Sequence, residues 1–128
     1  TLTAFGKLGV KVMIAELDID VMPAHSQNNS AEVSRREAAA PPMNPYRLGL
    51  PDSVQQALAA RYGELFAVYL RHADKISRVT FWGVTDGDSW LNNWPIRGRT
   101  NHPLLFDRSG KTKPAFTNVI ETVPRPKL

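Results

Sequence analysis

Three acidic residues at alternate positions end a β-branched run, and they are the first candidates for chemistry in this sequence. The run from Val10 to Asp20 reads VKVMIAELDID, and Glu16 stands where a strand is expected to give way to a loop. Alternate residues of an extended chain point to the same face, so Val12, Ile14 and Glu16 are expected to share one. Parallel sheets and (β/α) barrels keep their chemistry at the carboxyl ends of buried strands. The alternative is that Glu16 only caps or solvates the strand end.

The elements that must position these acids follow a βαβα order. Hydrophobic periodicity predicts helices wherever apolar residues recur three or four positions apart, and strands in the β-branched runs. Two parallel strands with a right-handed crossover are therefore expected. The expected elements are a helix end over Thr1–Leu8 capped by Gly9, a strand over Val10–Glu16, a helix over Asp52–Asp74, a strand over Ile76–Val84, a short apolar patch over Pro103–Asp107 and a helix over Lys113–Val123.

Several local features refine this expectation. Ser53 and Gln56 have the spacing of a capping box at the start of the long helix. Tyr62 and Tyr69 lie on its apolar stripe and are interpreted as packing residues, and Pro114 suits the first turn of the last helix. A short helix is a weaker expectation for residues 30–40, in the long polar connection after the first strand. Because that strand is apolar on both parities, burial on both of its faces is expected.

Composition limits the classes of function. The 128 residues carry a net charge of +4, but the basic residues are scattered, so a nucleic-acid partner is not expected. No apolar run approaches the roughly 18 residues of a membrane helix, so no membrane partner is expected either. There is no cysteine, and the chain has no glycine-rich phosphate loop or dinucleotide fingerprint, so no cofactor is expected. His25, His72 and His102 lack ligand spacing, which argues against a metal site.

Two motifs in the expected succession resemble a known family. The string GVKVMIAELDI from Gly9 to Ile19 is similar to the nucleophile-strand motif of the family 10 glycoside hydrolases, the endo-β-1,4-xylanases. The string VTFWGVTDGDSWL from Val79 to Leu91, then PLLFD and KPAF, is similar to that family's eighth strand, active-site loop and last helix. One departure is Ala15, where the family usually has serine or threonine.

The resemblance implies an α/β fold that is part of a TIM (β/α)8 barrel. Residues 1–128 would be the C-terminal segment of a single catalytic domain, incomplete without preceding residues. They would contain strands and helices seven and eight only, after the tail of helix six. A partner supplying the rest of the barrel, in the same chain or another, is implied. An extracellular or periplasmic location follows by family analogy.

The resemblance also assigns roles to acidic residues. Glu16 would be the nucleophile of a retaining mechanism, in which two carboxyl groups stand about 5 to 5.5 Å apart. Asp18 would lie behind it and hold a histidine from the sixth strand. The acid/base partner follows an asparagine in the family, and no Asn-Glu pair occurs in this sequence. Glu64, in mid-helix, cannot replace it, so the isolated chain is expected to be inactive.

Aromatic and basic residues of the second motif would bind the substrate, xylan or xylo-oligosaccharide. An indole can cover the apolar face of a sugar while its N–H donates a hydrogen bond. By the resemblance, Trp82 projects into the barrel mouth and Trp90 closes the site around the sugar. Without the resemblance, both tryptophans would be interpreted as core residues. Trp94 is left open. Arg97 and Arg99 are either substrate contacts or solvated loop residues.

Asp86 and Asp88 lie in the same loop and are interpreted as turn and loop hydrogen-bonding residues. The sequence as a whole is thus expected to supply the nucleophile and aromatic wall of a retaining endo-1,4-β-xylanase. The alternatives are a non-catalytic xylan-binding module that uses the tryptophans, and a self-associating half barrel.

Overall fold

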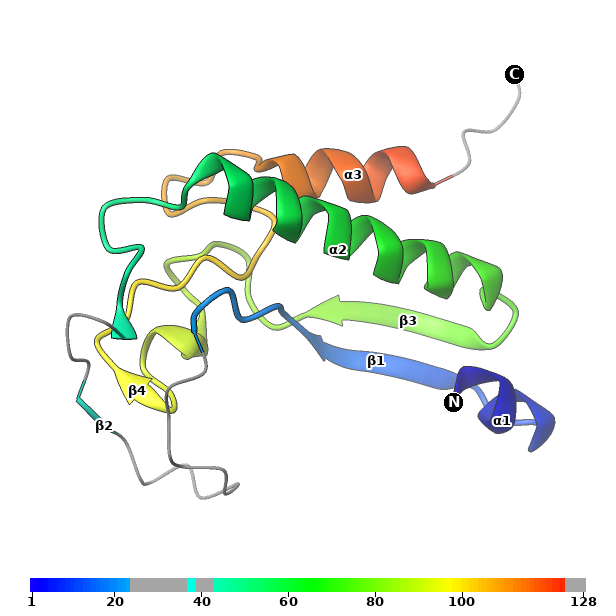
Figure 1. Cartoon of the computed structure of the whole chain (residues 1–128). Helices are drawn as coiled ribbons and strands as arrows, with labels where there is room; N and C mark the ends of the chain where they lie inside the picture. Colours follow the sequence, from blue (N-terminus) through cyan, green and yellow to red (C-terminus); the bar gives the residue numbers. More distant parts are fainter. Residues whose placement is uncertain (24–36, 39–42, 124–128) are drawn as a thin grey trace.

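The computed structural model describes residues 1–23, 37–38 and 43–123. The described elements are arranged around two short parallel ladders (Figure 1). Their order is α1 (Leu2–Lys7), β1 (Val12–Leu17), β2 (Glu37–Ala38), α2 (Asp52–Arg71), β3 (Ile76–Phe81), the 3₁₀ turn η2 (Trp90–Asn92), β4 (Ile96–Arg97) and α3 (Pro114–Thr122).

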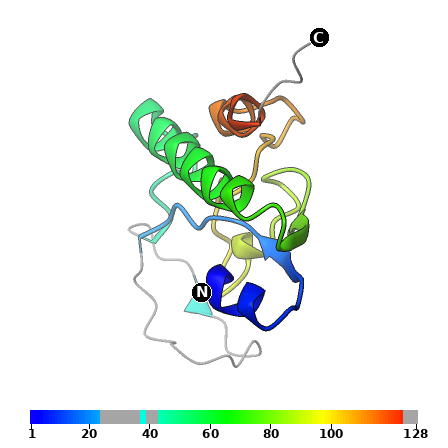
Figure 2. The ribbon, with the colours of Figure 1, turned by 90° about the vertical axis from the view of Figure 1, so that its right-hand side faces the viewer.

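The expected pairing of the two long strands is confirmed. β1 and β3 are parallel neighbours, and α2 belongs to the connection between them. Parallel strands need such a crossover because the chain must return to the starting end of the sheet. α2 and α3 lie on the same side of the pair, with α2 next to the strands, in both views (Figures 1 and 2).

The hydrophobic core lies between the helices and one face of the β1–β3 pair. Leu17 is buried there, and Val79 and Phe81 of β3 pack against the same cluster. Tyr62 is fully buried, with its ring centroid 5.8 Å from that of Phe81 and its hydroxyl donating to the carbonyl of Pro103 at 2.5 Å. Tyr69 packs at the edge of this core, so both tyrosines are packing residues, as predicted.

The other face of β1 differs from the expectation. Met13 and Ala15 are exposed, so within this chain the strand is not buried on both faces. The register is also irregular, because the four residues of β1 from Ile14 to Leu17 lie opposite only three residues of β3, from Val79 to Phe81. This is a β-bulge, and it changes the face on which the following side chain lies. Glu16 is therefore exposed beside Ala15, and its predicted shared face with Ile14 is wrong.

The helix ends confirm some predictions and correct others. Gly9 follows α1 with a φ of 73°, which is the left-handed conformation expected of a capping glycine. Pro114 opens α3 as predicted. The capping box is wrong, because α2 already begins at Asp52 and Pro51 precedes it without a side-chain cap.

The strands also end differently from the prediction. β3 ends at Phe81, before the predicted Val84. Most of the helix predicted over residues 30–40 lies outside the described residues, and its described part, Glu37–Ala38, is a strand paired with β4. Among the described residues, no helix is both long and apolar enough to cross a membrane.

Candidate active site

The carboxyl ends of β1 and β3 lie side by side because the two strands are parallel (Figure 1). The backbone N–H of Trp82 donates to the carbonyl of Leu17 at 3.1 Å, so the pairing continues one residue past β3. The loops that carry the candidate residues leave from these two ends.

Glu16 and Trp82 both turn away from the helix layer. Glu16 precedes the buried Leu17 and is exposed. On β3, Phe81 packs into the core, while the next residue, Trp82, is 46% exposed. The structure thus brings an accessible carboxylate and an accessible indole to neighbouring strand ends, on the face that α2 does not cover.

Asp18 and Trp90 join the two loops directly. The indole N–H of Trp90 donates to the Asp18 carboxylate at 2.8 Å. Trp94 stacks on Trp90, with ring centroids 4.7 Å apart and 19° between the ring planes. Trp90 keeps 38% of its surface exposed. The N–H of Trp90 is thus engaged by Asp18, and Trp94, which sequence reasoning left open, stacks on the Trp90 ring.

The surroundings of Asp18 favour its protonated form. Partial burial raises the pKa of this carboxyl, the hydrogen bond from Trp90 acts in the opposite direction, and the negative charges of Asp20 and Glu16 raise the pKa further. The charges of Glu16 and Asp20 therefore both act on Asp18, which lies between them in the sequence.

Asp20 makes a second connection between the loops. It accepts from Arg99 Nη2 at 3.1 Å, from Asn101 Nδ2 at 2.7 Å and from the backbone N–H of Met22 at 2.8 Å. The Arg99 side chain is only 2% exposed, so its guanidinium faces the protein interior. The alternative that Arg99 is a solvated loop residue is therefore wrong, and its substrate contact stays a prediction. Arg97 in β4 is exposed, and its substrate contact stays a prediction.

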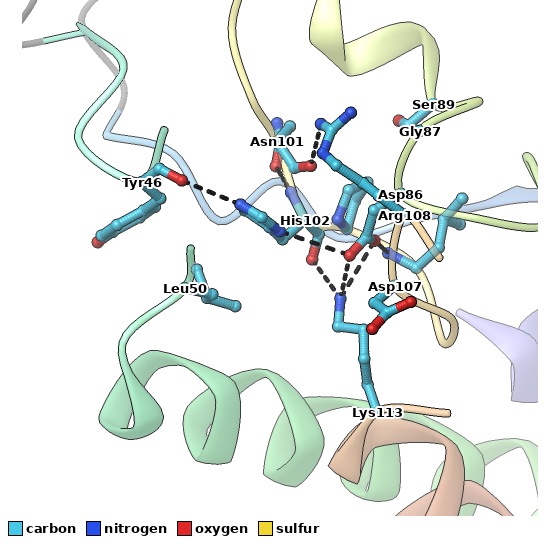
Figure 3. Close-up of polar contacts among 12 residues, drawn as sticks. Tyr46, Leu50, Asp86, Gly87, Ser89, Asn101, His102, Asp107, Arg108 and Lys113 are labelled. Atoms are coloured by element: carbon cyan, nitrogen blue, oxygen red, sulfur yellow. Dashed lines mark hydrogen bonds and ion pairs between the residues drawn. The ribbon is translucent and has the colours of Figure 1, made fainter. Parts of the chain in front are cut away.

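A buried ion pair holds the long loop after β3 (Figure 3). Asp86 is fully buried and its two oxygens lie 3.1 and 2.9 Å from Lys113 Nζ, which also donates to the carbonyl of His102 at 2.8 Å. Asp86 further accepts from the backbone N–H of Leu104 at 2.9 Å. Burial lowers the pKa of Lys113, and the contact with Asp86 acts against this shift.

The same cluster reaches the segment before α2. The imidazole of His102 has Nδ1 3.5 Å from Asp86 Oδ2 and Nε2 3.1 Å from the carbonyl of Tyr46 (Figure 3). Asp86 is thus a loop hydrogen-bonding residue, as predicted, and so is Asp88, which accepts from the Thr85 hydroxyl at 2.7 Å. Sequence reasoning did not identify Lys113 as the partner of Asp86, although the position of Lys113 just before the helix-opening proline restricts its backbone conformation.

In the part of the chain that the structure describes, no three His, Cys, Asp or Glu side chains form a group able to hold a metal ion. His25 lies outside the described residues, His72 follows the end of α2, and His102 lies in the loop before α3.

Comparison with known proteins identifies the family. Residues 1–122 match the model of glycosyl hydrolase family 10. The chain belongs to this family. Among its relatives, endo-1,4-beta-xylanase A of Xylanibacter ruminicola is 40% identical over 121 residues, which cover 94% of this chain and 33% of that protein. A thermostable celloxylanase of Thermoclostridium stercorarium is 37% identical over 117 residues, which cover 91% of this chain and 26% of that protein.

Solved structures agree with this assignment. A family 10 endoxylanase retrieved from a sugarcane soil metagenome superposes with a TM-score of 0.89 at 48% identity, covering 95% of this chain and 35% of that one. Family 10 structures are TIM barrels, and the partial parallel sheet seen here is consistent with part of one. The chain spans about a third of the length of the relatives it matches.

The raised pKa of Asp18 predicts a pH dependence of stability. The folded state keeps the Asp18 proton to a higher pH than the unfolded state, so folding weakens as pH rises from the ordinary aspartate pKa of about 3.9 to the raised one. Asp18→Asn removes this ionisation and keeps an oxygen that can accept from Trp90. We expect its free energy of unfolding to match the wild type in strong acid and to exceed it increasingly across that window, measured by urea denaturation at each pH.

Asp74 provides a control of opposite sign. It is exposed, and the hydrogen bond from Lys75 lowers its pKa. Asp74→Asn should therefore lose stability relative to the wild type as pH rises through the acid range. An Asp18→Asn profile parallel to the wild type at every pH would contradict the prediction.

Proposed function

We propose that this chain supplies the nucleophile and the aromatic sugar-binding wall of a retaining endo-1,4-β-xylanase. The observation that carries the proposal is the accessible carboxylate of Glu16, at the carboxyl end of β1, beside the accessible indole of Trp82 at the end of β3. Membership of glycosyl hydrolase family 10 supports xylan as the substrate.

Each step of the proposed reaction needs two carboxyl groups. The ionised Glu16 attacks the anomeric carbon, the glycosidic C–O bond breaks, and a second carboxyl group protonates the leaving oxygen. That second group, now a base, then takes a proton from water, whose oxygen displaces Glu16 and releases the sugar with its anomeric configuration retained. Glu16 is regenerated as a free carboxylate.

The described acids nearest in sequence to Glu16 have other partners. Asp18 holds Trp90, and Asp20 holds Arg99 and Asn101. Glu64 lies in α2, where it pairs with Arg61 at 3.0 Å. Because the Asn-Glu pair that carries this role in the family does not occur in the sequence, we assign the acid/base role to a residue outside these 128, either in the same polypeptide or in a partner chain.

The shape of the described part supports a place within a barrel. β1 and β3 form a two-stranded sheet with helices on one side, as adjacent strands seven and eight would. An apolar hollow of about 170 Å³ lies beside the end of β3, lined by Phe81, Gly83, Val84, Leu105 and Phe106. In the proposal, the open face of the pair is the barrel interior, and the missing strands continue the sheet. An extracellular or periplasmic location is part of the proposal, by analogy with the family.

Replacing Glu16 tests the nucleophile role. Glu16→Gln keeps the size of the side chain and removes the negative charge that attacks the anomeric carbon. In the protein as it occurs naturally, this substitution should lower the rate of xylan hydrolysis by about a thousandfold or more. Reducing-sugar release measures this. Glu64→Gln is the matched control on α2 and should retain activity. A Glu16→Gln variant that hydrolyses xylan normally would contradict the nucleophile role. The binding-module alternative instead predicts that the wild type binds xylo-oligosaccharide without hydrolysing it, and that Glu16→Gln leaves this binding unchanged.

The proposal that the second catalytic carboxyl group lies outside these 128 residues can be tested with the isolated chain. We expect the purified 128-residue chain, with no other polypeptide present, to release no xylo-oligosaccharides from xylan. Chromatography of the products measures this, with light scattering to report whether copies associate as a half barrel would. Turnover by the isolated chain would contradict the proposal that the acid lies elsewhere.

A further inference from the structure

The side chain of Trp90 is held by groups from two separate segments. Its backbone begins η2, whose next two residues, Leu91 and Asn92, are buried. The Ser89 hydroxyl caps this turn by accepting from the backbone N–H of Leu91 at 3.2 Å. The backbone under the indole is therefore fixed by the β3–α3 loop itself.

The ring plane is fixed separately. Trp94 stacks on one face of the Trp90 indole at a centroid distance of 4.7 Å. The Asp18 carboxylate accepts a hydrogen bond from the N–H of the same Trp90 indole at 2.8 Å. A stacked face limits tilting of the ring, and a bonded edge limits rotation within its plane. Trp90 nevertheless keeps 38% of its surface exposed, so the residue stays accessible to a ligand.

We infer that Asp18 is a positioning residue that fixes the orientation of the Trp90 indole, as a hydrogen-bond acceptor, before a sugar binds. This inference rests on the proposed function for the identity of the ligand. It differs from the role that family resemblance implies, in which Asp18 holds a histidine behind the nucleophile. A ring that is already ordered loses less rotational freedom on binding, so the orientation improves affinity.

The surroundings of Asp18 favour an acceptor role over a charge role. Its carboxylate is partly buried next to Glu16 and Asp20, both of which carry the same charge. Asp20 is compensated by Arg99, whereas the donor to Asp18 is a neutral indole. An uncharged oxygen at the same place can accept the same hydrogen bond.

Indole N–H resonances test this directly. In ¹H–¹⁵N spectra of tryptophan-labelled protein, as its source produces it, Trp90→Phe identifies the Trp90 signal by its disappearance. Asp18→Ala should shift this signal upfield and speed its exchange with water, because the acceptor is gone, while Asp18→Asn should leave it near the wild-type position. The Trp82 signal should not move in either variant. Asp20→Asn, which removes the same charge from the same loop, should also leave the Trp90 signal in place.

Kinetics then test the consequence for binding. With xylo-oligosaccharide as substrate, Asp18→Ala should raise KM by about tenfold while kcat falls less, which corresponds to losing one good hydrogen bond, and Asp18→Asn should recover most of the loss. An unmoved Trp90 signal in Asp18→Ala, or a fall in kcat with unchanged KM, would overturn the inference. If the wild-type protein does not hydrolyse xylan, the proposed function fails, but the indole spectra still decide the role of Asp18.

Discussion

One extra residue in β1 determines where the proposed chemistry lies. Without the bulge between Ile14 and Leu17, strict alternation would direct Glu16 toward α2, into the hydrophobic core. With it, Leu17 fills the core and Glu16 remains accessible on the opposite face. An unpaired carboxylate is costly to bury. The irregular register is what allows Leu17 to be buried while the adjacent Glu16 stays exposed. Bulges commonly redirect a side chain next to an active site in this way.

Polar contacts connect the loops around this carboxylate to each other and to α3. Asp18 and Asp20 connect the β1 loop to the loop after β3, and the buried pair of Asp86 and Lys113 fixes that second loop to α3. Removing one member of a buried ion pair leaves an uncompensated charge, which commonly costs about 3 to 5 kcal/mol. The same loop also buries Leu91, Ile96 and Leu104, while Trp90 stays partly exposed.

The sequence predicted what depends on local pattern. The parallel strands, the long helix and the proline at the start of α3 follow from periodicity and backbone chemistry, and the motifs around Glu16 and Trp82 indicated the family. The bulge leaves no pattern in VMIAEL, and alternation predicted the wrong face. The partners of Asp18 and Arg99 come from the other loop, so no local signal could reveal them.

Covalent trapping tests the central claim most directly. A xylobioside with fluorine at C2 and a good leaving group forms the glycosyl-enzyme but hydrolyses slowly, since the fluorine destabilises both transition states and the leaving group restores only the first step. The protein as its source produces it would be incubated with this reagent, digested and analysed by mass spectrometry. The account predicts the added sugar mass on the peptide that contains Glu16. A label on another carboxylate, with Glu16 unmodified in the inactivated enzyme, would contradict it.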